Sequence, residues 1–486
     1  MNLRVTPCRA SSRRALWIAT LGASVVLLRL AVAAHVPILD DEAYYWLWSR
    51  HLAWGYPDHP PLIAALIALS TALLGRGPLA IRILPLLLAS ATPVLAYLAG
   101  REMFNRPAGV RAAFLLLPLP AFMLGTVFAF PDGPMAFLWM LSLWMGWRAL
   151  CRGGWWWVVT GAAIGLTFLS KEMALFLVLG LAGTALTDPE RRFFRDPRWY
   201  LGLAAAAALV APVVLWNAQH DWATARVILN RELWTAPRSV PLNLLAFTAG
   251  QVLFFGPLAL LLAAAAVAAA RRASTPVWRY LAWMSLPILA LAVAGALGAR
   301  AKPHWPAPAY SVAAIALGAL WPQWARLRSV LVQSLAALTV LLTLGLSALA
   351  FLPRLADLAG GRWDLAARMV AREALSQKAF VLASNYQLAS QLRYHLEEAD
   401  GRILVTTPFR AFRLWNPPQG LAGRSVVYAE DRHDADRNSP PRLPLQTFCR
   451  NVRPAGRVVL APQRVLVLYR CEDFSGSFAG LPPWGP

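Results

Sequence analysis

Apolar segments recur along most of this chain, and short polar stretches rich in arginine separate them. A helix needs about 20 apolar residues to cross the hydrocarbon core of a bilayer. Over its 486 residues the chain is 58% hydrophobic and only 14% charged, which excludes an ordinary soluble protein. We therefore expect an all-α polytopic membrane protein with about 11 transmembrane helices. The candidate spans are 15–36, 79–99, 110–129, 134–150, 157–170, 172–186, 199–218, 244–270, 278–298, 306–322 and 329–352, and the pair on either side of Lys171 is alternatively one broken helical unit.

One apolar segment, 61–74, decides the predicted topology. As a helix it would be roughly 21 Å long, which is short of the ~30 Å hydrocarbon core. We therefore predict that it lies in the interface, within a first external loop over 37–78. Every arginine cluster then falls on the cytoplasmic side, as the positive-inside rule requires, and the first span is expected to be retained. The net charge of +22 thus reflects cytoplasmic loops, and we expect no nucleic-acid partner.

The same topology gathers a second set of polar residues on the external face, although the arginine argument did not use them. Charged residues and histidines close to membrane segments are costly unless they have a function. Their convergence predicts an external active site. The set comprises Asp40, Asp41, Glu42, Asp58, His59, Asp132, Lys171, Glu172, His220, Asp221, Arg226, Arg231, Glu232, Lys302 and His304.

After Pro353 the composition becomes mixed, which predicts a small external α/β domain over 353–486 behind a membrane domain over 1–352. Short alternating runs predict strands at 380–383, 426–429, 458–461 and 465–469, and 362–375 has helical periodicity. The Gly- and Pro-rich tail from Phe474 is expected to be loose. Cys449 and Cys471 fall in this external domain on either side of a predicted hairpin, so we expect them to form a disulfide.

The first external loop carries the densest group of candidate site residues. Asp41 and Glu42 are candidate catalytic carboxylates, because a carboxylate can take the proton of an acceptor hydroxyl. The alternative is an acidic cap on a membrane-surface helix. The remaining candidates in this loop are Asp40, Tyr44, Tyr45 and His59 for substrate and Asp58 for a metal.

Three further candidates lie at or inside the predicted spans. Asp132, in FAFPDGPMAF, is either a turn residue or a second acid of the site. Lys171 interrupts an apolar stretch and needs an anion, either a phosphate or an acid of the outer loops. Arg29, near the outer end of the first span, either snorkels to the interface or binds a lipid phosphate.

Later loops contribute His220, Arg226 and His304 as candidate substrate contacts. For His220 and Arg226 the alternative is an interfacial helix with solvated charges. For His304, which precedes Trp305, the alternative is an anchor at the membrane interface.

At DDEAYY, YPDHPPL, PDGP, FLSKE, WNAQHDW and KPHWPAPAY the chain resembles a known family. It is similar to the bacterial membrane glycosyltransferases related to protein O-mannosyltransferases and to the lipid A aminoarabinose transferase. The resemblance runs from about Arg29 to Trp321, is strongest in the first loop and is weak beyond Pro353. It implies the GT-C fold, with interfacial helices in the first external loop. It also implies a polyprenyl-phosphate sugar donor, a site on the outer face of the inner membrane, and inversion at the anomeric carbon.

The resemblance also carries roles onto matching positions. The acidic pair of the family's first loop matches Asp41-Glu42, with the aspartate as base, and its second-loop acid matches Asp132. Asp58 and His59 stand where the aminoarabinose transferase has a glutamate and a lysine that serve metal and phosphate. Its later metal-binding histidine has no match, because the chain reads Asn230-Arg231-Glu232 there. A divalent metal at Asp58 is therefore left open, and no cofactor is required.

Taken with the external polar residues, the resemblance implies an inverting glycosyltransferase that moves a sugar from a polyprenyl-phosphate carrier to lipid A, an envelope glycan or a protein. Asp41 is the predicted base, and Lys171, His59 and Arg29 are the candidate cations for the leaving phosphate. One alternative is a transporter or flippase of lipid-linked saccharides, which would show paired broken spans in two related halves. The sequence shows no such repeat. A non-catalytic lipid-binding scaffold is the other alternative.

Overall fold

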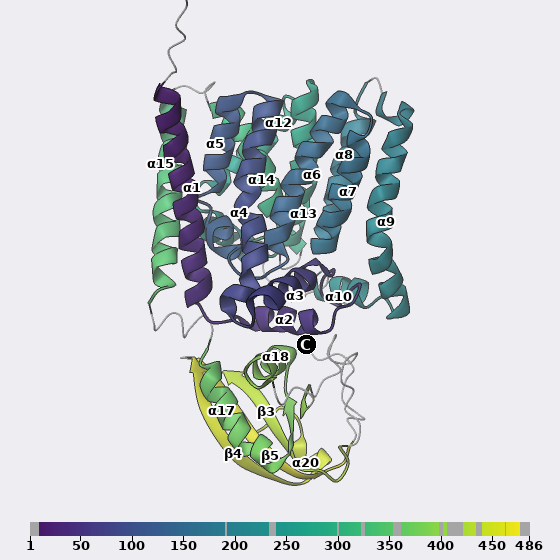
Figure 1. Ribbon diagram of the computed structural model, residues 1–486, viewed down its shortest axis with the longest axis vertical. Coiled ribbons are helices and arrows are strands. Elements are labelled where there is room, and N and C mark those ends of the chain that lie inside the picture. Colours follow the sequence, from purple (N-terminus) through teal and green to yellow (C-terminus); the bar gives the residue numbers. More distant parts are fainter. Residues whose placement is uncertain are drawn as a thin grey trace, which may run out of the picture.

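The computed structural model describes residues 9–189, 192–232, 240–298, 301–321, 326–352, 361–397, 402–405, 421–433, 440–461 and 463–476. A bundle of helices forms one part of the molecule, and a domain built on a β-sheet lies beyond one end of the bundle (Figure 1). The predicted fold class, a polytopic helical protein with a small C-terminal α/β domain, is confirmed.

The bundle is formed by helices that run side by side, and α2 and α3 lie at the end facing the sheet domain (Figure 1). Its elements are α1 (Arg9–His35), α2 (Asp40–Arg50), α3 (Leu62–Leu74), α4 (Pro78–Met103), α5 (Arg106–Leu116), η1 (Ala121–Gly125), α6 (Asp132–Arg152), α7 (Trp156–Ser170), η2 (Glu172–Ala174), α8 (Leu175–Leu186), η3 (Arg192–Arg195), α9 (Pro197–Gln219), α10 (Ala223–Glu232), α11 (Val240–Phe255), α12 (Ala259–Ala270), α13 (Pro276–Gly298), α14 (Ala307–Leu320) and α15 (Arg326–Leu349).

By length and composition, four helices of the described chain can cross a membrane alone, namely α4, α9, α13 and α15. The number rises to 6 if the bent pairs α1–α2 and α11–α12 each count as one span. Several other apolar helices, including α7 and α14, are shorter. The count of about 11 spans therefore stays a prediction.

Two predicted spans are broken. The segment 110–129 is not one helix, because α5 ends at Leu116 and the short π-helix η1 follows Pro118 and Pro120. Proline lacks the backbone donor that a continuous helix needs. The segment 244–270 bends by 101° between α11 and α12. Gly256 lies at the bend with φ +69, a left-handed value that glycine accepts readily, and proline follows it.

The helix over the segment 61–74 has the pattern expected of an interfacial helix. In α3 the buried side chains include Ile63 and Ile67, while Leu69, Leu73 and Leu74 are 54%, 72% and 62% exposed. One face thus packs on the protein, and the other presents leucines that suit contact with lipid.

The C-terminal domain is a five-stranded sheet with order β2-β1-β3-β5-β4. β1 runs parallel to β2 and β3, whereas β3, β5 and β4 are antiparallel neighbours. Its elements are α17 (Trp363–Glu373), η5 (Leu375–Gln377), β1 (Phe380–Ala383), α18 (Tyr386–His395), β2 (Ile403–Val405), β3 (Val426–His433), α20 (Leu445–Phe448), β4 (Cys449–Ala461) and β5 (Arg464–Phe474).

This domain confirms most of what the sequence predicted there. All four predicted strands are present, and among the strands of the described residues the short β2 was not predicted. Cys449 and Cys471 form the expected disulfide between β4 and β5, with their Cα atoms 5.5 Å apart. The expected loose tail from Phe474 begins one residue too early, because Phe474 ends β5. The tail from 477 lies outside the described residues.

Helix α18 packs directly on α2. One continuous core joins the two, with Trp46 and Trp48 of α2 and Ala389 and Leu392 of α18 all buried. The first loop is therefore held between the bundle and the C-terminal domain, and this arrangement positions the site.

Candidate active site

Three consecutive acids open α2 and point in three directions, because each residue of an α-helix is turned by about 100° from the last. Asp40 faces the C-terminal domain, Asp41 faces a cavity, and Glu42 faces the interior of the bundle. Acids in the first turn also suit the positive end of the helix dipole. The adjacent acids therefore have different environments and different functions.

Glu42 is fully buried and bound in place. Its two carboxylate oxygens accept hydrogen bonds from Arg82 Nε and Nη2 at 2.7 and 2.5 Å. They also accept the backbone N–H groups of Leu39 and Ala129. The remaining Arg82 donors bind the carbonyl groups of Ala33, Val36 and Pro37. The predicted catalytic role of Glu42 is therefore not supported, because its side chain does not line the cavity and its oxygens are already engaged.

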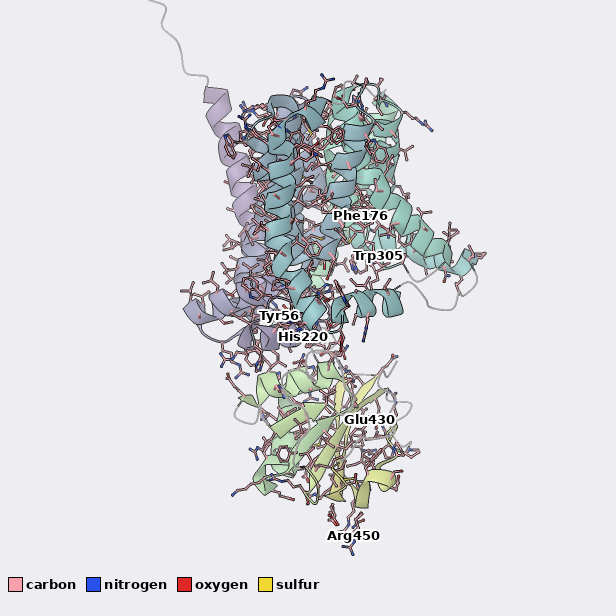
Figure 2. All side chains as sticks on the ribbon, turned by 90° about the vertical axis from the view of Figure 1, so that its right-hand side faces the viewer. Tyr56, Phe176, His220, Trp305, Glu430 and Arg450 are labelled. Carbon is pink, nitrogen blue, oxygen red and sulfur yellow. A yellow bond between two sulfur atoms is a disulfide. The ribbon has the colours of Figure 1, made fainter. Side chains whose placement is uncertain are left out.

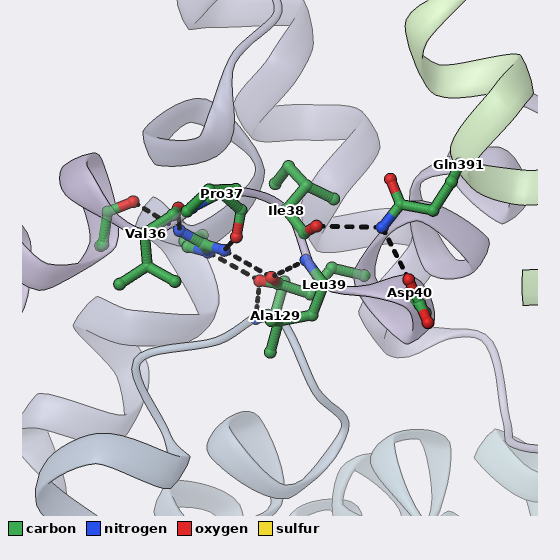
Figure 3. Close-up of polar contacts among 10 residues, drawn as sticks. Val36, Pro37, Ile38, Leu39, Asp40, Ala129 and Gln391 are labelled. Atoms are coloured by element: carbon green, nitrogen blue, oxygen red, sulfur yellow. Dashed lines mark hydrogen bonds and ion pairs between the residues drawn. The ribbon is translucent and has the colours of Figure 1, made fainter. Parts of the chain in front are cut away.

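Asp40 is likewise not placed to bind substrate. Its carboxylate lies 2.8 Å from Arg464 Nη2 and accepts a 3.0 Å hydrogen bond from Gln391 Nε2 (Figure 3). Both partners belong to the C-terminal domain. Asp40 therefore joins the two parts of the molecule.

A cavity of about 580 Å³ opens beside Asp41, within the size range of small-molecule sites. Its polar lining includes Asp41, Tyr45, Asp58, His59, Asp132, Lys171, Glu172, Lys302 and His304. Its apolar lining includes Leu116, Leu119, Phe122, Met135, Trp139, Phe176, Val227, Ile228, Phe254 and Phe255. Phe176 lies within the bundle, whereas Trp305, another lining residue, lies nearer the C-terminal domain (Figure 2). The cavity thus offers both a charged and an apolar surface.

Asp132 and Lys171 form an ion pair on the cavity wall, with Lys171 Nζ 2.8 Å from Asp132 Oδ1. The polypeptide places them together because Asp132 opens α6 and Lys171 is an extended residue between α7 and η2. Ser170 Oγ also donates to the carbonyl of Pro131 at 2.7 Å. Burial raises the pKa of the Asp132 carboxyl, but the charges of Lys171, His304 and His59 and the hydrogen bond from Lys171 outweigh it. The net pKa lies well below the usual range, so Asp132 remains ionised.

The other first-loop residues surround the same space. Asp58 accepts a 3.1 Å hydrogen bond from Tyr44 Oη, and His59 Nδ1 lies 3.6 Å from Glu172 Oε2. Tyr44 itself is buried and is not a lining residue. Tyr45 follows Asp41 by one helical turn and lines the cavity with it. Burial, followed by the charge of Asp41, raises the pKa of Tyr45 well above its usual value, so its hydroxyl keeps its proton.

The predicted metal ligand Asp58 lines the cavity together with His59 and Glu172. Within the described part of the chain, no group of three or more His, Cys, Asp or Glu side chains is placed to hold a metal ion. The Asp58 carboxylate is instead hydrogen-bonded to Tyr44. A metal at Asp58 therefore stays a prediction that this geometry does not support.

Besides Asp40 and Tyr44, three predicted substrate contacts lie away from the cavity lining. His220 stacks on Trp216 with ring centroids 4.2 Å apart, and Arg226 is exposed while its neighbours Val227 and Ile228 line the cavity. Arg29 does not snorkel, because it is fully buried and donates to the carbonyl and hydroxyl oxygens of Thr126. The predicted His304 does line the cavity.

Sequence reasoning left three polar neighbours of the site without a role. Lys302 and Glu172 line the cavity and flank the predicted residues His304 and Lys171, so adjacency was a usable signal. Tyr386 lies 345 residues from Asp41 in the sequence and contacts it in space. No local pattern marks such a long-range contact.

Comparison with known proteins shows which families and structures this chain is similar to. A family model described as dolichyl-phosphate-mannose-protein mannosyltransferase matches residues 58–216. The lipid A galacturonosyltransferase RgtD of Rhizobium johnstonii is 30% identical over 384 residues, which cover 76% of this chain and 80% of that protein. An undecaprenyl phosphate-alpha-4-amino-4-deoxy-L-arabinose arabinosyl transferase of Pseudomonas aeruginosa is 27% identical over 241 residues, or 46% of this chain and 42% of that protein. The crystal structure of ArnT from Cupriavidus metallidurans bound to undecaprenyl phosphate has a TM-score of 0.66 at 16% identity, covering 97% of this chain and 99% of that chain.

The fold and these relatives define a membrane glycosyltransferase of the GT-C type. The chain belongs to the superfamily of polyprenyl-phosphate-sugar-dependent enzymes that includes the protein mannosyltransferases and the lipid A sugar transferases. The predicted reaction class, a glycosyltransferase that uses a lipid-phosphate sugar donor, is confirmed. The predicted place in a bacterial membrane agrees with these relatives and with the apolar helices of the described chain, and the periplasmic side of the site stays a prediction.

Proposed function

We propose that this enzyme transfers a hexuronic acid from undecaprenyl phosphate to lipid A on the periplasmic face of the inner membrane. The observation that carries the proposal is the two-sided cavity, in which Asp41, Asp132 and Lys171 share one space with a large apolar surface. A polyprenyl-phosphate sugar is itself two-sided, with a charged head and a hydrocarbon chain. A cavity with one polar part and one apolar part suits such a ligand.

In the proposed reaction Asp41 accepts the proton of the acceptor hydroxyl. The acceptor oxygen forms a bond to the anomeric carbon as the bond from that carbon to the phosphate oxygen breaks. Attack opposite the departing phosphate inverts the anomeric centre. The leaving group is undecaprenyl phosphate, and cations near it stabilise its charge. Lys171, with His59 beside it in the lining, is the proposed source of positive charge.

Glu42 and Asp132 have distinct supporting roles in this proposal. Glu42 anchors the start of α2 through Arg82 and so fixes where Asp41 stands. Asp132 holds Lys171 at the cavity wall and stays ionised, which keeps the ammonium group oriented. We therefore assign proton transfer to Asp41 alone.

The sugar is the least constrained part of the proposal. RgtD supports a uronic acid, since it is named a galacturonosyltransferase and matches 80% of its length. The cavity lining also contains the cation of Lys302 and the imidazole ring of His304, which suit a sugar carboxylate. An aminopentose, the sugar named for the Pseudomonas relative, would bring its own positive charge into the same lining.

The direct test is transfer by purified protein in detergent or nanodiscs. The protein is supplied with lipid A and, in separate reactions, with undecaprenyl phosphate carrying galacturonic acid or 4-amino-4-deoxy-L-arabinose. Mass spectrometry of lipid A then reports the added mass. Transfer of the uronic acid in preference to the aminopentose supports the proposal. Preferential transfer of the aminopentose would overturn the sugar assignment, and transfer of neither would overturn the proposed function.

The proposed orientation is tested separately. Gly77 precedes α4 in extended backbone with φ 167, and no atom lies within 4 Å of the place a Cβ would take, so Gly77→Cys should be tolerated. Gly75 has φ +74 and is a poorer choice. An impermeant thiol reagent added to intact spheroplasts should label Gly77→Cys. Labelling only after the inner membrane is breached would reverse the orientation.

A further inference from the structure

We propose that Tyr386 of the C-terminal domain is a positioning residue of the active site, whose phenolic hydroxyl holds the carboxylate of Asp41. The inference rests on the proposed function, because it gives a role to the residue proposed as the base. It also gives the C-terminal domain a part in the reaction, which neither the family resemblance nor the sequence assigns to it.

The contact itself joins two distant parts of the chain. Tyr386 Oη donates to Asp41 Oδ1 at 3.4 Å. The ring of Tyr386 is buried, with only 6% exposed, and lies 4.7 Å from the ring of Tyr44. Asp41, by contrast, is exposed at the mouth of the cavity. A buried donor therefore meets an exposed carboxylate.

The position of Tyr386 is set by its own helix. Asn385 caps α18, since its side chain accepts a hydrogen bond from the N–H group of Leu388 at 2.8 Å. The helix therefore begins at Tyr386, and the side chain of this first-turn residue packs on Tyr44 of α2.

Two further contacts hold α18 and the sheet against the first turn of α2. Gln391, itself fully buried, donates to the carbonyl of Ile38 and to Asp40, both at 3.0 Å (Figure 3). Arg464 Nη2 lies 2.8 Å from Asp40 and 2.7 Å from Asp431, which joins β5 and β3 to the same turn. Asp40 and Asp41 are adjacent, so these contacts also fix the backbone that carries Asp41.

The contact with Tyr386 determines in which direction the protonation equilibrium of Asp41 is displaced. A hydrogen bond donated to a carboxylate favours its ionised form. Other titratable groups line the same cavity and also act on Asp41. They are Tyr45, Asp58, His59, Asp132, Lys171, Glu172, Lys302 and His304. Removal of the Tyr386 hydroxyl leaves these groups in place and should make Asp41 easier to protonate.

The test compares Tyr386→Phe with Tyr394→Phe in the full-length enzyme. Tyr394 lies on the same helix and packs on Trp46 of α2 with ring centroids 5.2 Å apart, so it is a matched control for helix packing. We expect Tyr386→Phe to lower kcat by about tenfold, the scale of one hydrogen bond to a charged group. The acid limb of its kcat/KM profile should move to higher pH, while KM for the donor changes little.

Tyr394→Phe should leave the pH profile at the wild-type position. A wild-type profile in Tyr386→Phe would overturn the inference, and so would an equal shift in both variants, since that would indicate general loosening of the interface. Wild-type enzyme is measured in the same assay. If it transfers sugar normally while Tyr386→Phe is unchanged, the inference fails and the proposed function stands.

Discussion

Two ion pairs, Glu42–Arg82 and Asp132–Lys171, have similar chemistry but lie in different environments. Glu42 and Arg82 are both fully buried, and every donor of the guanidinium is used in a hydrogen bond. Asp132 and Lys171 have side chains that are 32% and 10% exposed, and they border the cavity. The Arg82 guanidinium has no hydrogen-bond donor left for a ligand. A pair on a cavity wall can replace one of its contacts with a contact to a ligand. Burial therefore distinguishes the structural pair from the pair that can bind a ligand, although both pairs consist of an acid and a base.

The largest expected effect is loss of folding when the buried pair is broken. Arg82→Met leaves the buried Glu42 carboxyl without its partner, and breaking a buried pair in this way costs about 3–5 kcal/mol. We expect little monodisperse protein in size-exclusion chromatography and a strongly lowered thermal midpoint. Arg76→Met is the control, because Arg76 is partly exposed. Normal yield and stability for Arg82→Met would show that the pair is not a structural anchor.

Breaking the cavity pair should change binding more than stability. In Lys171→Met, Asp132 loses its partner but keeps contact with the cavity, so the protein should still fold. We expect affinity for undecaprenyl phosphate to fall by about 10- to 100-fold, as for a lost hydrogen bond to a charged group. Binding is measured by isothermal titration calorimetry, with Lys378→Met, an exposed lysine of the C-terminal domain, as control. Unchanged affinity would remove Lys171 from the phosphate site.

The same pair predicts a pH dependence. The pKa of Asp132 is held well below its usual value by Lys171 against the effect of burial. A carboxyl with a depressed pKa stabilises the fold above its unfolded pKa, about 3.9, and that contribution is lost only as the pH falls through the lower folded value. Wild-type thermal stability should therefore show no loss from this group between neutral pH and about pH 4. In Lys171→Met this acid-induced loss below about pH 4 should be smaller, because removal of Lys171 raises the folded pKa of Asp132 toward its unfolded value. Coincident stability–pH curves would contradict the assignment.

The smallest effect is expected at an exposed pair between the two domains. Arg76 Nη1 lies 2.7 Å from Glu397 Oε2, with side chains 36% and 45% exposed. Exposed pairs contribute about 0–1 kcal/mol and weaken with salt. Glu397→Gln should therefore shift the thermal midpoint only slightly at low salt and not at high salt. A large shift would mean that burial does not determine how much each ion pair contributes to stability.

Much of the fold was predictable because it rests on patterns within single segments. Hydrophobic runs predicted the helices, and alternation predicted the strands β1, β3, β4 and β5. The length of the segment 61–74 indicated a helix too short to cross. The breaks at η1 and Gly256 were missed although prolines mark both, because hydrophobicity dominates a span prediction.

The site was predictable in its location and less so in its roles. Asp41, Asp132, Lys171, His59 and His304 were all expected on one face and do line one cavity. Glu42 was not distinguished from Asp41, because the difference depends on Arg82, 40 residues further along the chain. The contact of Tyr386 with Asp41 arises from domain docking and has no trace in either local sequence.

Variants of two adjacent residues of α2 test most directly which acid is catalytic and which is structural. Asp41→Asn and Glu42→Gln each keep the shape of the side chain and remove its charge. Turnover and undecaprenyl phosphate binding are measured on both purified proteins, alongside thermal stability. We expect Asp41→Asn to fold and bind like wild type and to lose about 10²- to 10⁴-fold in kcat, the range for general-base catalysis. Glu42→Gln should instead lose stability. Near-full turnover in Asp41→Asn, with turnover lost in a stable Glu42→Gln, would reverse the assignment of the two acids.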